Sequence, residues 1–178
     1  MEWYNEPDAW KAVGETIEVT TAGKTDFWRR THSGAIRDNG HFYYARQSGD
    51  FMCEVRLSGK YAAQYDQAGL MVRADEANWL KCGIELVDGV QNVSAVLTRE
   101  FSDWSIVPAP QRPASIWLRA TVHGSTIEVH YSLDGSRYTL LRLGYLPRAE
   151  TISAGIMCAS PQGNGFPASF TGFVIRPA

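Results

Sequence analysis

The sequence lacks the features that mark several large classes of protein. Its 178 residues contain no run of Lys or Arg and no acidic tail, and the formal net charge is −2. Proteins that bind nucleic acid or anionic membranes concentrate positive charge, so we expect neither partner. No apolar segment approaches the roughly 20 residues that span a bilayer. The opening MEWYNEPDAW has neither the basic end nor the apolar run of a signal peptide.

Cysteine is scarce, and its placement argues against metal chemistry. The three cysteines, Cys53, Cys82 and Cys158, each lie in an apolar alternating run, far from one another in sequence. Isolated cysteines in apolar runs are usually reduced core residues, whereas a zinc site would need paired spacing with His partners. The sequence therefore predicts no metal and no other cofactor. Reduced thiols without a signal peptide favour a cytoplasmic location.

Helical periodicity is also missing. We find no convincing helix of three turns, but roughly a dozen short segments alternate between apolar and polar residues, with turn signals every 8 to 12 residues. This pattern is typical of a β-sandwich or barrel. No linker divides the chain, so we expect a single all-β domain over residues 1–178. Near the end, the spacing of Phe170, Phe173 and Ile175 slips by one at 171–172, which predicts a β-bulge.

The most informative stretch covers residues 61–86, YAAQYDQAGLMVRADEANWLKCGIEL. It contains two alternating segments on either side of a short polar loop at 75–78, which favours a hairpin. Alternation places each set of side chains on its own face of a sheet. The aliphatic face should be core, and the other should form the floor of a groove, with Gly69 and Gly83 leaving room above it. The floor residues would be Gln67, Met71, Arg73, Trp79, Lys81 and Glu85.

This mixed face has two interpretations. A sugar site needs a flat aromatic ring to stack on a pyranose, which Trp79 and Trp104 could supply, and planar polar groups that bind hydroxyls. Alternatively, Lys81 and Glu85 could form a simple ion pair on a hydrated face, which would stabilise the fold by roughly 0–1 kcal/mol if exposed. The combination of large aromatics, an amide and charges with two glycines favours the ligand site.

Two aspartates lie next to tryptophans in the sequence. Asp26 precedes Trp28 by two residues, and Asp103 directly precedes Trp104. We expect them either at the rim of the same groove or as acceptors that cap turn amides.

The segments TDFWRRT, DNGHFYY, YDQAGLMVR, NWLKCGIE, SDWS, YSLDG and MCASPQGNGF extend over nearly the whole chain. They resemble a concanavalin A-like family of uncharacterised function, sometimes called the regulation-of-enolase family. The resemblance implies a jelly-roll sandwich of two antiparallel sheets, one of them concave. It implies little chemistry, because the family has no agreed activity and fold does not determine function.

Three functions remain open. The first is non-catalytic binding of a carbohydrate or small polar ligand on the concave face, through Gln67, Met71, Arg73, Trp79, Lys81, Glu85, Asp103 and Trp104. The second is regulation of metabolism through a protein partner. The third is glycoside hydrolysis with Glu85 as one carboxylate. Hydrolysis needs two carboxylates about 5–9.5 Å apart, and the neighbours of Glu85 on its own face are Gly83 and Lys81. A second carboxylate would have to come from another strand.

Overall fold

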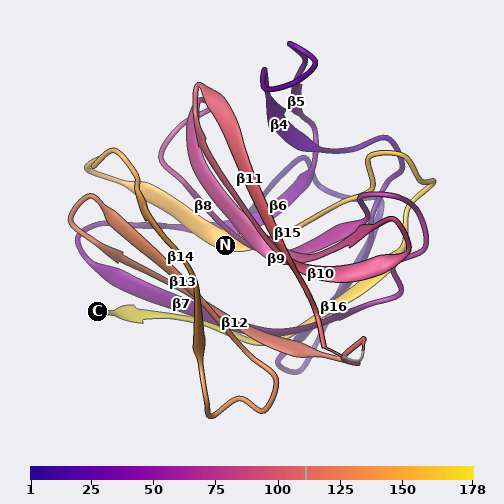
Figure 1. Cartoon of the computed structure of the whole chain (residues 1–178). Coiled ribbons are helices and arrows are strands. Elements are labelled where there is room, and N and C mark those ends of the chain that lie inside the picture. The colour runs from indigo at the N-terminus through magenta and orange to yellow at the C-terminus, as the bar shows by residue number, and fades with distance from the viewer. Residues whose placement is uncertain (111) are drawn as a thin grey trace.

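The computed structural model describes residues 1–110 and 112–178, and the regular elements in them are all β-strands (Figure 1). The described residues contain no helix that could span a membrane. The strands form two seven-stranded antiparallel sheets and one small hairpin. The structure confirms the jelly-roll sandwich that the family resemblance implies.

The first sheet is the concave one. In spatial order its strands are β1 (Glu2–Tyr4), β6 (His41–Gln47), β15 (Ile152–Ala159), β8 (Gln67–Arg73), β9 (Asn78–Val87), β10 (Val90–Arg99) and β11 (Phe101–Pro108). The second sheet is ordered β14 (Thr139–Tyr145), β13 (Thr126–Ser132), β12 (Ile116–His123), β7 (Phe51–Gly59), β16 (Pro167–Pro177), β3 (Thr16–Thr20) and β2 (Ala9–Val13). The hairpin pairs β4 (Phe27–Arg29) with β5 (Ile36–Asp38) and lies beside β11 (Figure 1).

The main core lies between the two sheets. The alternating aliphatic residues of β8 and β9 point into it, as predicted, and meet the inward faces of β7, β12 and β13. The three cysteines are unpaired and buried in the same core. The core side chains of these strands include Val55, Leu70, Val72, Leu80, Ile84, Leu118 and Val129.

The predicted hairpin of β8 and β9 is confirmed. Gln67 lies opposite Glu85, Gly69 opposite Gly83, and Met71 opposite Lys81. The mixed faces of the two strands therefore lie side by side on the concave face of the sheet.

The expectation of an open floor along this whole face is wrong for one end of it. Met71 and Trp79 are 0% and 1% exposed, because they belong to a second apolar cluster on the concave face. Phe27, at the start of β4, packs edge-on against the Trp79 indole at 6.4 Å and covers it. The cluster consists of Phe27, Phe42, Met71, Trp79, Val96 and Met157.

The aromatic N-terminal segment forms β1 and β2, which lie at the edges of the two sheets. The hairpin of β4 and β5 was not expected as strands. The bulge is confirmed, since the pairing of β16 with β7 shifts register between Thr171 and Val174.

Two facing glycines allow the close approach of β8 and β9. A Cβ added to Gly69 would overlap the carbonyl oxygen of Cys82, and one added to Gly83 would overlap that of Ala68. A backbone atom cannot move aside as a flexible side chain can. Any larger residue at either position would therefore separate the strands that form the centre of the concave face.

We expect Gly83→Ala to lower the free energy of unfolding by about 3 kcal/mol, because the new methyl group overpacks against backbone. The control is Gly124→Ala in the β12–β13 turn. There φ is +59° and no atom lies near the added Cβ, so only the left-handed backbone conformation costs energy, about 1 kcal/mol. Chemical denaturation measures both changes. Equal losses in the two variants would contradict the proposed backbone overlap.

Candidate functional site

A cleft of about 640 Å³ opens on the concave face, between the β4–β5 hairpin and β11. Its floor comes from β8 and β9, one wall from residues 26–33, and the opposite wall from β11 and the segment before β8. The cleft is lined by Asp26, Trp28, Thr31, His32, Ser33, Tyr65, Gln67, Lys81, Glu85, Ser102, Asp103 and Trp104. Five predicted site residues, Gln67, Lys81, Glu85, Asp103 and Trp104, therefore lie around one opening.

Lys81 connects the hairpin to the sheet. Its Nζ donates to the carbonyl oxygen of Phe27 at 2.6 Å and to Oδ1 of Asp26 at 3.2 Å. Lys81 is 4% exposed, and its ammonium also lies 5.9 Å from the centre of the Trp79 ring. A buried ammonium is stable only with such partners. The ion pair between Lys81 and Glu85, which was the alternative to a ligand site, does not form, because Lys81 pairs with Asp26.

Glu85 has one oxygen held and one free. Its Oε2 accepts from Ser94 Oγ at 2.7 Å and from Trp104 Nε1 at 2.9 Å. Its Oε1 has no hydrogen-bond partner among the described residues. Although Glu85 is only 6% exposed, this oxygen keeps some contact with solvent, and Glu85 lines the cleft. Burial raises the pKa of Glu85 above its ordinary value of 4.5, and the opposing effects of Lys81, Ser94 and Trp104 do not cancel this shift.

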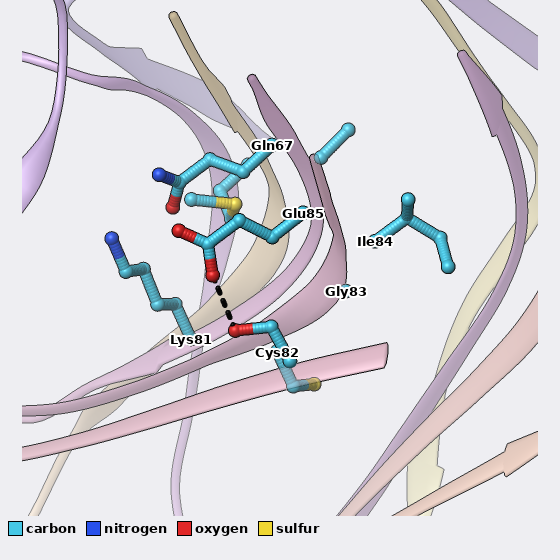
Figure 2. A pocket seen from close by; sticks show the side chains of 9 residues that line it. Gln67, Lys81, Cys82, Gly83, Ile84 and Glu85 are labelled. Carbon is cyan, nitrogen blue, oxygen red and sulfur yellow. Dashed lines mark hydrogen bonds between the residues drawn. The ribbon is translucent and has the colours of Figure 1, made fainter. Parts of the chain in front are cut away.

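Figure 2 shows Gln67, Lys81 and Glu85 pointing toward one another, whereas Ile84 points away toward the core. The Gln67 amide nitrogen donates to the carbonyl oxygen of Tyr65 at 3.1 Å and approaches Asp26 Oδ1 at 3.5 Å. The glycines leave little room here. The cavity over Gly83 measures about 10 Å³, no larger than the space for one water molecule.

Aromatic rings form parts of both walls. Trp104 is 38% exposed, and its ring packs edge-on against Tyr65 at 6.2 Å. Its Nε1–H is held by Glu85, which fixes the plane of the indole. On the other wall, Trp28 donates its Nε1–H to the carbonyl oxygen of Thr31 at 2.9 Å. Each indole therefore has its polar atom bonded within the protein and its ring at the cleft.

Three predicted site residues do not line the cleft. Met71 and Trp79 are covered by the second apolar cluster. Arg73 lies at the far end of β8, where its guanidinium makes two hydrogen bonds to Asp38 at 2.6 and 2.9 Å. Asp103 lines the cleft, but its Oδ2 accepts from Arg142 of β14 at 2.8 Å, so its charge is already paired.

Sequence reasoning missed several lining residues, among them Tyr65, Trp28 and the hairpin tip at 31–33. The proximity of Trp28 to Asp26 in the sequence was the available signal, because the rim of the groove was one of the two positions expected for Asp26. Among the described residues, no three His, Cys, Asp or Glu side chains gather as metal ligands would.

The fold and the cleft together define a jelly-roll β-sandwich with a polar, aromatic-walled cleft on its concave sheet. The chain belongs to the family described as "Protein of unknown function (DUF1349)", which matches residues 3–178. It is 37% identical over 169 residues to "Regulation of enolase protein 1" of Saccharomyces cerevisiae, covering 95% of this chain and 85% of that one. The family resemblance stated from the sequence is thereby confirmed.

Solved structures support the same conclusion about fold. A functionally unknown protein from Saccharomyces cerevisiae superposes with a TM-score of 0.96 at 36% identity, covering 99% of this chain and 96% of that one. The GH43 protein BlXynB of Bacillus licheniformis gives 0.74 at 16% identity, with 97% of this chain matching 36% of that protein. The carbohydrate-binding module CBM66 of Bacillus subtilis gives 0.63 at 13% identity, with 98% and 94% coverage. At these low identities the last two show the fold alone.

We expect Lys81→Met to lower the free energy of unfolding by about 2 kcal/mol, because it leaves the Asp26 carboxylate and the Phe27 carbonyl without their buried donor. Lys11→Met is the control. Lys11 forms an ion pair with Glu18 at 3.0 Å in which both side chains are largely exposed, so its loss should cost less than about 0.5 kcal/mol. Chemical denaturation compares the two, and a Lys81 effect as small as that of Lys11 would contradict its role.

The raised pKa of Glu85 predicts a pH dependence of stability. Between 4.5 and the higher pKa of the folded state, the folded protein binds more protons than the unfolded chain, so stability falls as pH rises. Glu85→Gln cannot titrate. We therefore expect the wild type to lose stability relative to Glu85→Gln as pH rises through this window, measured by denaturation at a series of pH values. A difference that stays constant with pH would contradict the shift.

Proposed function

We propose that the cleft binds a carbohydrate or a small polar ligand without transforming it. The observation that carries the proposal is the exposed Trp104 ring, fixed beside a floor of largely buried polar groups. Binding pockets commonly have volumes of about 300–1,000 Å³ and combine aromatic walls with a few fixed polar groups. The cleft, at about 640 Å³, lies in this range.

The arrangement suits a sugar in particular. A pyranose has an apolar face that can lie against an indole and a rim of hydroxyls that exchange hydrogen bonds. Trp104 supplies the indole, and Gln67, Lys81 and Glu85 supply the polar groups at its foot. The similarity in fold to a carbohydrate-binding module of Bacillus subtilis supports the proposal.

A second candidate function is glycoside hydrolysis. It is favoured by the presence of two carboxylates, Asp26 and Glu85, in one cleft, and by the raised pKa of Glu85, which suits a general acid. Against it, Asp26 Oδ1 already accepts from Lys81 and from the backbone N–H of Phe27. This engagement makes Asp26 a poorer base or nucleophile, so binding is the preferred proposal.

A regulatory role through a protein partner is a third candidate. It is supported by the name of the yeast relative and by exposed apolar side chains on two edge strands. Phe101 and Val107 lie on β11, and Leu143 and Tyr145 lie on β14, all between 45% and 61% exposed. This surface is separate from the floor of the cleft, so substitutions there and in the cleft distinguish the two functions.

We expect Trp104→Ala to weaken glycan binding by about 5- to 150-fold, because an aromatic contact of this kind stabilises binding by about 1–3 kcal/mol. Trp117→Ala is the control, since Trp117 lies on β12 of the other sheet beside Arg56. A glycan array identifies the ligand, and isothermal titration measures affinity for wild type and both variants. Unchanged binding in Trp104→Ala, or equal weakening in Trp117→Ala, would overturn the site.

A further inference from the structure

The floor of the cleft offers hydrogen-bond acceptors and has few donors to spare. The Nε1–H groups of Trp28 and Trp104 are both used within the protein. Two of the three protons of the Lys81 ammonium are directed to Phe27 and Asp26. A ligand therefore meets few donors at the floor.

Three acceptor atoms remain without a partner among the described residues. They are Oε1 of Glu85, Oε1 of Gln67 and Oδ2 of Asp26. None of the three is fully buried, so each can be reached by solvent. The orientation of the Gln67 amide follows from its neighbours. Its nitrogen faces two acceptors, the Tyr65 carbonyl and Asp26 Oδ1, so its oxygen must face away from them. All three residues line the same cleft.

The charged groups of the lining also disfavour an anionic ligand. The lining includes three carboxylates, those of Asp26, Glu85 and Asp103, and a single ammonium, that of Lys81. Arg142 pairs with Asp103 and Lys81 with Asp26. Glu85 is the lining carboxylate without an ion pair, because no cationic nitrogen of the described residues lies within ion-pair distance of it. An anion entering the cleft would approach this unpaired carboxylate in a partly desolvated space, where like charges repel strongly.

We infer that the cleft selects ligands by the hydrogens they donate, taking neutral sugars and amino sugars and rejecting uronic acids and sugar phosphates. The inference rests on the proposed function and adds the class of ligand. Glu85 is the residue that determines this specificity, since its free Oε1 accepts from a hydroxyl or ammonium and opposes a carboxylate. An ammonium adds a charge-assisted bond, so amino sugars should bind at least as tightly as neutral ones.

The test uses three β-1,4-linked hexasaccharides that share a linkage and differ in charge. One is made of neutral glucose, one of glucosamine and one of glucuronic acid. The glycan array should carry the same three charge types on other backbones, so that the comparison can be made on whichever backbone binds. Isothermal titration at low ionic strength measures affinity for wild type, Glu85→Gln and the control Glu128→Gln. Glu128 lies on β13 of the other sheet and does not line the cleft.

We expect the wild type to bind the acidic form at least about tenfold more weakly than the neutral form. Glu85→Gln should narrow this gap about tenfold, because it removes the opposing charge and adds a donor, and Glu128→Gln should leave it unchanged. Equal or tighter binding of the acidic form by the wild type would overturn the inference and leave the proposed function standing. Failure of every glycan to bind would overturn both.

Discussion

The buried ammonium of Lys81 is the interaction on which the cleft depends. Asp26 and the carbonyl of Phe27 belong to the hairpin segment, whereas Lys81 belongs to the sheet. These hydrogen bonds hold the hairpin over the concave face. Burying Lys81 or its partners without these bonds would cost free energy, so the hairpin is favoured in the position that forms them. The wall that carries Trp28 and the cleft opposite β11 both follow from it.

The hairpin divides the concave face into two parts. At one end Phe27 covers Trp79 and Met71, and the face becomes a second core. At the other end Gln67, Glu85 and Trp104 remain around an opening. Trp79, near the start of β9, therefore contributes to the second core, and Glu85, near the end of the same strand, contributes to the candidate site. Both side chains lie on the same face of the sheet.

Much of the fold was predictable, because a strand period of two is local. The alternation in residues 67–86 correctly assigned Leu70, Leu80 and Ile84 to the core and Lys81 and Glu85 to the opposite face. The site was predictable only in part. Trp79 shares a face with Lys81, but whether it meets solvent depends on Phe27, more than 50 residues earlier in the chain. No pattern within the strand could show that cover.

The sequence by itself determined which residues share a face, since backbone geometry alternates side chains whatever surrounds the strand. It also determined the all-β class, because short alternating segments bury their apolar faces when sheets pack together as a sandwich or close into a barrel. Tertiary structure alone decided which part of the concave face is closed. It did so by pairing Lys81 with Asp26 in place of Glu85, and an ion pair between distant segments forms only where the folded chain brings the two charges together.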